Sequence, residues 1–214
     1  MTVYYLHGFA SSTRSTKARY FAEHLSGHGI RLRSPDFNEP DFATLTMTRM
    51  LEQLAVDVAT AGDDPVTLIG SSLGGALAVL AAERLGDRIE RLVLLAPAVM
   101  FSNPAHHLLP PGRVEEWRAR GSWPFFHYGY QEERELNFAL YEDTLRYDAF
   151  GARFLQPTLV FQGRRDSSVD PASVEAFASQ RSNVTLTFLD DDHQLLSSLP
   201  RIWKDVEAFL ELAE

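Results

Sequence analysis

A serine set between glycines is the first feature of the sequence that could carry chemistry. Residues 66–85 read VTLIGSSLGGALAVLAAERL, so the GSSLG motif at 70–74 joins an apolar strand-like segment to an alanine-rich helical one. A G-x-S-x-G motif in a strand-to-helix turn is typical of a nucleophilic serine that projects from a strained backbone. The glycine spacing selects Ser72, because the flanking positions around Ser71 are apolar. A tight turn, or an anion site at a helix N-terminus, is the structural alternative.

A nucleophilic serine needs a base, and the base needs an acid that fixes its tautomer. In sites of this kind the order along the chain is serine, acid, histidine. His193, in FLDDDHQLL, directly follows a strand-like segment, and we expect it to be the base. Asp166, in VFQGRRDSSVD, follows another such segment and is the expected acid. Asp170 is the alternative acid, although its place before Pro171 favours a helix N-cap.

Other histidines and aspartates are expected to have different roles. His106, His107 and His127 lie in a long segment between strands, where we expect surface or lid positions. His7 follows the first strand, on the wrong loop for the base, and is expected to be structural. The aspartates at 190–192 are too close in sequence to the expected base to pair with it, so we predict a solvated turn.

An acyl-transfer reaction also needs donors for the oxyanion that forms on the carbonyl oxygen. One expected donor is the backbone N–H of Leu73, directly after the serine. The second is expected in the HGFASS loop after the first strand, from Phe9, with Ala10 as the next choice.

These residues follow strands that alternate with helices along the chain. The predicted strands are 2–6, 30–34, 66–70, 91–97, 157–163 and 184–190, and the predicted helices are 16–27, 42–60, 73–85, 171–180 and 201–213. Alternation of this kind predicts an α/β fold with a parallel sheet covered by helices on both faces. Ligands then bind beyond the carboxyl ends of the strands, where the candidate residues lie.

The segment 98–155 breaks the alternation, because it is too long for a simple crossover. It holds half of the aromatic residues of the chain, 12 of 24. Two interpretations stay open: a helical insertion with its own small core, or a lid whose aromatic face closes over an apolar substrate group. In the second case Trp123 and Phe126 are candidate substrate contacts.

Composition limits the classes of function. The chain has 214 residues, a net charge of −9, 45% hydrophobic residues and no cysteine. We expect one domain over 1–214 that needs no disulfide, thiolate metal site or cysteine nucleophile. The acidic balance argues against a general nucleic-acid binder. The sequence contains neither a signal peptide nor an apolar run that could span a membrane, so a cytoplasmic protein is expected.

The motifs YLHGF, GSSLGG, GRRDSSV and DDHQL, in that order, resemble the α/β-hydrolase superfamily. The stretch YLHGFASSTRSTKA at 5–18, together with GSSLGG, is similar to the small bacterial YqiA-like esterases. The resemblance implies an α/β-hydrolase fold and an esterase or thioesterase for short acyl groups, with acyl-CoA among the candidate substrates. Because the chain opens at the strand before the HGFASS loop, we expect six parallel strands in the order 2-1-3-4-5-6.

Three basic residues, Arg14, Lys17 and Arg19, lie near the start of the first helix, where cations oppose the helix dipole. Solvation at the surface, or pairing with nearby acids, is the ordinary explanation. The functional alternative is that Arg14 and Lys17 contact a phosphate-bearing substrate such as a CoA thioester.

The sequence therefore predicts hydrolysis of a small carboxylic ester or thioester by Ser72, His193 and Asp166, without a metal or organic cofactor. A peptidase or amidase that uses the same three residues is one alternative. A non-catalytic binding protein with a hydrolase fold is the other.

Overall fold

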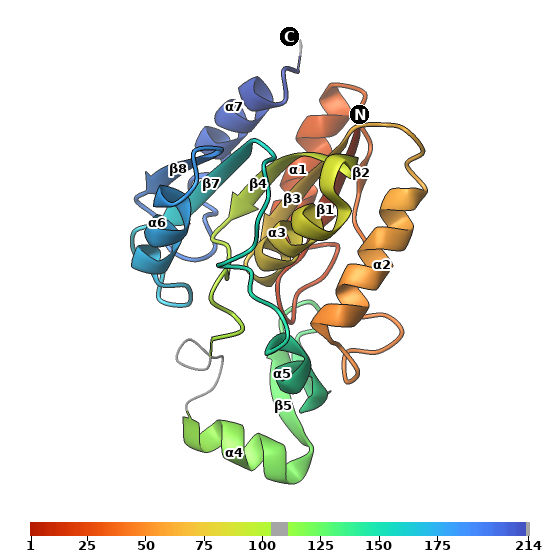
Figure 1. Cartoon of the computed structure of the whole chain (residues 1–214), viewed down its shortest axis with the longest axis vertical. Coiled ribbons are helices and arrows are strands. Elements are labelled where there is room, and N and C mark those ends of the chain that lie inside the picture. Colours follow the sequence, from red (N-terminus) through yellow and green to blue (C-terminus); the bar gives the residue numbers. More distant parts are fainter. Residues whose placement is uncertain (104–110, 213–214) are drawn as a thin grey trace.

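A six-stranded parallel sheet forms the centre of the computed structural model, which describes residues 1–103 and 111–212 (Figure 1). Its strands are β1 Thr2–Leu6, β2 Leu32–Arg33, β3 Val66–Ser71, β4 Ile89–Leu95, β7 Thr158–Gly163 and β8 Val184–Leu189. They lie in the order β2-β1-β3-β4-β7-β8, and every neighbouring pair is parallel. The predicted fold class and strand order are thus confirmed. His106 and His107 lie outside the described residues.

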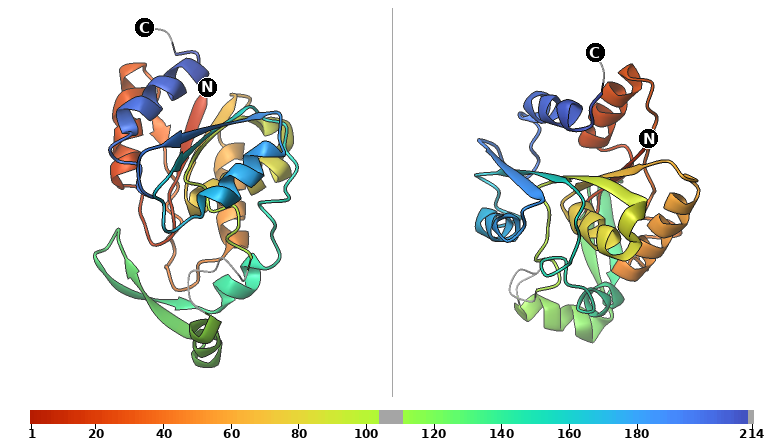
Figure 2. Two further views of the ribbon diagram at one scale, coloured as in Figure 1. Left: turned by 90° about the vertical axis from the view of Figure 1, so that its left-hand side faces the viewer. Right: turned by 45° about the horizontal axis from the view of Figure 1, so that its top comes forward.

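Helices cover both faces of this sheet (Figure 2). The helices are α1 Thr16–Gly27 and α7 Leu199–Phe209 on one face, and α2 Met47–Ala59, α3 Leu73–Leu85 and α6 Pro171–Ser179 on the other. Successive strand residues point to opposite faces. In β1, for example, Val3 and Tyr5 pack with α1 and α7, whereas Tyr4 and Leu6 pack with α2 and α3.

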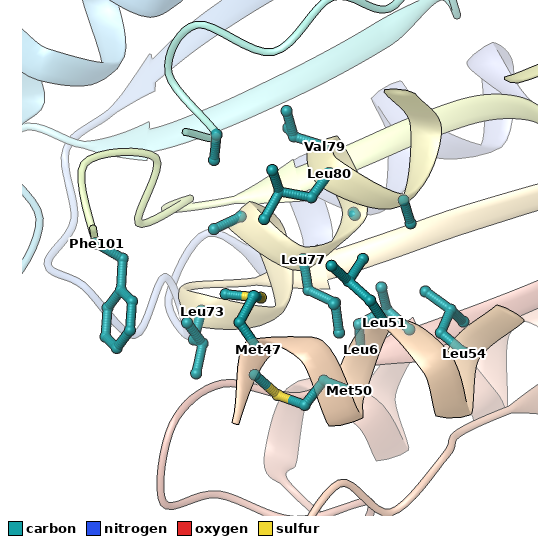
Figure 3. Packing of buried hydrophobic residues seen from close by; sticks show 14 of the residues in the cluster. Leu6, Met47, Met50, Leu51, Leu54, Leu73, Leu77, Val79, Leu80 and Phe101 are labelled. Atoms are coloured by element: carbon teal, nitrogen blue, oxygen red, sulfur yellow. The ribbon is translucent and has the colours of Figure 1, made fainter. Parts of the chain in front are cut away.

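Helix α3 lies deepest, because every residue from Leu73 to Ala82 is buried. A helix that is apolar on all sides must be enclosed by its neighbours. Figure 3 shows Leu73 and Leu77 of α3 beside the apolar side of α2, including Met47 and Leu51. This packing fixes the start of α3, and with it the GSSLG turn.

Several element boundaries differ from the sequence prediction, and two of the differences have a clear structural cause. Helix α2 begins at Met47 rather than residue 42, because the Thr46 side chain caps it by accepting a hydrogen bond from the backbone N–H of Arg49. Strand β2 has only two residues, Leu32 and Arg33, since it lies at the edge of the sheet and pairs on one side.

The segment 98–155 contains α4 Pro111–Arg120, an antiparallel hairpin of β5 Ser122–His127 and β6 Glu132–Asn137, and α5 Ala139–Thr144. The prediction of a helical insertion was therefore wrong in part. In the part of the segment that the structure describes, the small core of that interpretation is not separate, because buried residues such as Trp117 and Leu136 belong to the same apolar cluster as α2 and α3. Anchors to the main fold include the backbone N–H of Asn137, which donates to the Ala43 carbonyl at 2.9 Å.

In the described part of the chain, no helix has both the length and the apolar character that crossing a membrane requires.

Candidate active site

The GSSLG turn forms a tight connection between β3 and α3. Ser72 has φ 53° and ψ −116°, a conformation that costs energy in any residue other than glycine. Its two flanking glycines cannot be replaced without a clash: a Cβ on Gly70 would lie 2.3 Å from the Gly74 carbonyl oxygen, and a Cβ on Gly74 would lie 2.0 Å from the Leu6 carbonyl oxygen. The glycines thus let the backbone approach closely enough for the strained turn to project the Ser72 side chain.

Ser72, His193 and Asp166 form a continuous chain of hydrogen bonds. The Oγ of Ser72 lies 3.1 Å from Nε2 of His193, and Nδ1 of the same ring lies 2.8 Å from Oδ2 of Asp166. An ionised carboxylate can only accept, so Nδ1 carries the ring proton and Nε2 is free to accept from the serine hydroxyl. The three side chains come from the ends of β3, β7 and β8, which meet at one edge of the sheet.

Asp166 is held as a buried carboxylate. Burial by itself raises the pKa of this group, but hydrogen bonds from His193 and from the backbone N–H groups of Val169 and Ser168 outweigh it. The net result is a pKa below the usual value for aspartate. Oδ1 accepts from both backbone groups at 2.8 Å, and Oδ2 also accepts from Nε2 of Gln162 at 2.9 Å. The carboxylate is therefore oriented from both sides.

The loop that carries His193 is organised by an aspartate that the sequence analysis placed in a solvated turn. Asp191 is instead buried, and its Oδ2 accepts hydrogen bonds from both Ser197 and Ser198. Its carboxylate closes the turn that follows β8. That part of the prediction was wrong because a run of three aspartates does not reveal which one turns inward.

Two backbone N–H groups belong to segments that lie next to Ser72. The loop after β1 passes beside it, since a Cβ on Gly8 would lie 3.3 Å from the Cβ of Ser72. Phe9 follows directly in that loop, and Leu73 is the first residue of α3, where a helix leaves its N–H without an intrahelical partner. In the residues that the structure describes, neither N–H donates a hydrogen bond to a protein group.

A buried polar network supports the loop after β1. The Nε2 of His7 accepts from the backbone N–H of Phe37 at 3.1 Å, so Nδ1 donates to the Gly8 carbonyl at 2.9 Å. Asn38 donates to the Ser11 carbonyl and lies 3.0 Å from Nε2 of His127. His127 is fully buried, so the expectation of a surface position was wrong for this residue, and the lid position stays a prediction.

A cavity of about 910 Å³ opens over Ser72 and His193. Of the four residues considered as substrate contacts, Arg14, Lys17 and Phe126 line this cavity. Trp123 does not, because its ring packs against the guanidinium groups of Arg113 and Arg120.

Other cavity residues were not selected from the sequence. Phe125, Met100 and Phe101 contribute an apolar wall from the segment 98–155. Gln162 does not line the cavity but donates to Asp166, and it was also missed, although its position near the end of the predicted strand before Asp166 was a usable signal. In the described ranges, histidine and acidic side chains form no cluster of three or more that could hold a metal ion.

The sheet order and the strained serine turn define the class of protein, an α/β hydrolase. Solved structures agree with this class. A hydrolase from Agrobacterium vitis superposes with a TM-score of 0.83 at 24% identity, covering 97% of this chain and 87% of that one. Est1E from Butyrivibrio proteoclasticus, solved with ferulic acid bound, superposes with a TM-score of 0.84 at 21% identity, covering 99% of this chain and 89% of that one.

Within that class, the chain belongs to the family described as "Uncharacterised protein family (UPF0227)", whose profile matches residues 2–211. The chain is also 31% identical over 115 residues to lipase LipV of Mycobacterium tuberculosis. That match spans 48% of this chain and 40% of the lipase. The resemblance to the superfamily and to YqiA-like proteins is confirmed.

Proposed function

We propose that the protein is a serine hydrolase that cleaves small carboxylic esters or thioesters through an acyl-enzyme on Ser72. The observation that carries the proposal is the hydrogen-bonded chain from Ser72 through His193 to Asp166 beneath an open cavity. The relationship to lipases, esterases and other hydrolases supports the same class of reaction.

The geometry supports a two-stage mechanism. His193 accepts the Ser72 proton through Nε2 while the serine oxygen attacks the carbonyl carbon. Asp166 keeps the ring in the required tautomer and stabilises the imidazolium that forms. The backbone N–H groups of Phe9 and Leu73 donate to the oxyanion, and the leaving group departs with the proton from His193. Water then attacks the acyl-enzyme by the same steps and releases the acid.

The cavity supports a small-molecule substrate with an apolar part. Its aromatic lining includes Phe9, Phe125 and Phe126, and its volume of about 910 Å³ lies in the range of small-molecule sites. Short aliphatic esters, short acyl-CoA thioesters and an aromatic ester such as a ferulate therefore form the first substrate panel. The ferulate is included because Est1E was solved with ferulic acid bound.

The test compares two adjacent serines. Hydrolysis of p-nitrophenyl butyrate should be lost, by roughly a thousandfold or more in kcat, in Ser72→Ala. Ser71→Ala is the matched control and should keep most of the activity, because Ser72 is the serine whose hydroxyl lies within hydrogen-bond distance of His193. Full activity of folded Ser72→Ala would remove Ser72 from the mechanism.

Two other functions for this fold make different predictions. A peptidase or amidase would cleave peptide amides faster than matched esters, whereas we expect the reverse. A binding protein would take up ligand without turnover of any ester, thioester or amide in the panel.

A further inference from the structure

Lys17 is a buried cation in the wall of the active-site cavity. It is the second residue of α1, after the N-cap Ser15, and only 7% of its surface is exposed. It lines the same cavity as Ser72 and His193. Lysine is almost never buried to this extent unless another group pairs with it. Surface solvation therefore does not explain the position of Lys17, and pairing would require a partner close to its ammonium group.

No protein group pairs with this ammonium in the residues that the structure describes. Lys17 forms no salt bridge, and no hydrogen bond engages its Nζ. The polar side-chain atoms that are both sealed from solvent and unpartnered belong to other residues, Arg49 and Gln162. The Lys17 ammonium thus keeps access to the cavity, while its stem is enclosed by protein.

The nearest carboxylates are engaged elsewhere. Asp166, Asp192 and Asp191 act on Lys17 through their charges. Asp166 binds His193, Asp191 binds the 197–198 serines, and Asp192 accepts from the backbone of the His193 loop. Their charges favour the protonated form of Lys17, but none of them forms an ion pair with its ammonium group.

The position is unfavourable for a cation unless an anion joins it. Burial lowers the pKa of Lys17 to about 8, against the opposing effect of the three aspartates. The start of α1 adds the positive end of the helix dipole. Even so, a pKa of about 8 leaves most of these side chains protonated at pH 7. A negative group in the cavity would offset both costs.

The polar part of the cavity wall carries further positive charge beside Lys17. Arg14 and Arg19 stand with Lys17 on the wall formed by the start of α1. Among the described residues that line the cavity, Asp170 alone is acidic, and its Oδ1 already accepts from the backbone of α6. This excess of positive charge occurs in a chain whose net charge is −9. The wall from the segment 98–155, by contrast, is apolar.

We propose that Lys17 binds a carboxylate or phosphate group of the substrate, so that the natural substrate is an anionic ester or thioester. The proposal rests on the proposed hydrolase function and narrows its substrate class. The apolar wall receives the uncharged part of the substrate, and Lys17 fixes the charged part beside the reacting carbonyl.

Two substrate pairs test the proposal and locate the charge. Mono-p-nitrophenyl adipate against p-nitrophenyl hexanoate places a carboxylate on the acyl side. Acetyl-CoA against S-acetyl-N-acetylcysteamine places phosphates on the thiol side. The quantity measured is kcat/KM for the anionic substrate divided by kcat/KM for its neutral partner. Because it is a ratio, a general loss of activity in a variant cancels.

In Lys17→Met this ratio should fall roughly tenfold to a hundredfold for at least one pair, mainly through KM, since the variant loses a charged hydrogen bond. Lys17→Arg should keep most of the preference. Lys204→Met removes the other lysine of the chain, which is exposed on α7, and should leave the ratio unchanged. In wild type, KM for the preferred anionic substrate should rise as pH increases through and above 8, because the cation is lost.

Two results would overturn the proposal, and they are distinguishable. If wild type hydrolyses both members of each pair and Lys17→Met leaves both ratios unchanged, the anion site fails while the hydrolase function stands. If folded wild type hydrolyses none of the four substrates and no fluorophosphonate adduct forms on Ser72, the hydrolase function itself fails.

Discussion

At the scale of single residues, the proposed chemistry depends on how Asp166 is held. Its carboxylate accepts four hydrogen bonds, from His193, Gln162 and two backbone N–H groups, which leaves no freedom to reorient. Ionised Asp166 imposes one tautomer on His193, and that tautomer is the one able to accept the Ser72 proton.

Asp166→Asn should therefore lower kcat for p-nitrophenyl butyrate by roughly a thousandfold to ten-thousandfold, because an amide no longer enforces this tautomer. The matched control is Asp170→Asn. Asp170 caps α6 by accepting from the backbone N–H of Ala172, and asparagine caps a helix equally well. Equal losses in the two variants would contradict the assignment of Asp166 as the acid.

The glycines of the serine turn make a separate prediction about stability. Gly74→Ala should lower the free energy of unfolding by roughly 2–4 kcal/mol, since its Cβ would lie 2.0 Å from the Leu6 carbonyl oxygen. Gly112→Ala in α4 is the control, because a Cβ there meets no atom within 4 Å and alanine favours a helix. Urea denaturation measures both. A Gly74→Ala variant as stable as wild type would contradict this account, because it would show that the turn can accommodate a Cβ at position 74.

At the scale of elements, the β5–β6 hairpin is tied to the loop after β1 through buried His127, which contacts Asn38. Burial lowers the pKa of His127, and the positive charge of Arg134 acts in the same direction. The folded pKa is thus below the unfolded value of 6.5, so the unfolded state binds more protons as pH falls through 6.5. Protonation at His127 consequently favours unfolding below that pH.

His127→Gln should reduce the loss of thermal stability between pH 7.5 and pH 5.5, because glutamine cannot be protonated. The amide can still donate to Oδ1 of Asn38, which His127 Nε2 approaches at 3.0 Å. Thermal melts at several pH values measure the slope for both proteins. An identical slope in the two would contradict the role of His127.

The same hairpin is a part of the fold that the sequence did not predict. The strand-and-helix alternation predicted the parallel sheet, because continuous apolar segments and glycine or proline boundaries reflect burial on both faces. The strand order was predicted from the resemblance to α/β hydrolases. The 98–155 segment has no such period. Its hairpin is stabilised by contacts to distant residues, such as Trp117 Nε1 to the Leu136 carbonyl at 2.8 Å, and local patterning does not encode them.

For the candidate site, the motifs selected Ser72, Asp166 and His193 because each follows a strand that ends at one sheet edge. The geometry of the structure brings these three together, and their catalytic roles stay predictions. The inward turn of Asp191 and the burial of Lys17 could not be predicted, since local patterning shows neither the hydrogen bonds of Asp191 to Ser197 and Ser198 nor which side chains enclose Lys17.

At the scale of the whole molecule, the buried charge of Lys17 lowers the free energy of unfolding and also makes the cavity wall positive. Its folded pKa of about 8 lies below the unfolded value of 10.5, so the unfolded state binds more protons between these pH values. Stability therefore rises as pH increases from 8 towards 10.5, and below pH 8 the full cost of burying the cation remains.

Lys17→Met should consequently stabilise the protein at pH 7 by roughly 2–3 kcal/mol, because it removes the buried charge and keeps the apolar stem. Urea denaturation at pH 7 measures the change, with Lys204→Met as the exposed control. A destabilised Lys17→Met would indicate that the lysine has a structural partner.

The central claim is that Ser72 is an activated nucleophile, and intact-protein mass spectrometry after treatment with a fluorophosphonate tests it most directly. Wild type and Ser71→Ala should each gain the mass of one adduct, and Ser72→Ala should gain none. Folded wild type without an adduct, or an adduct that persists on Ser72→Ala, would contradict the claim.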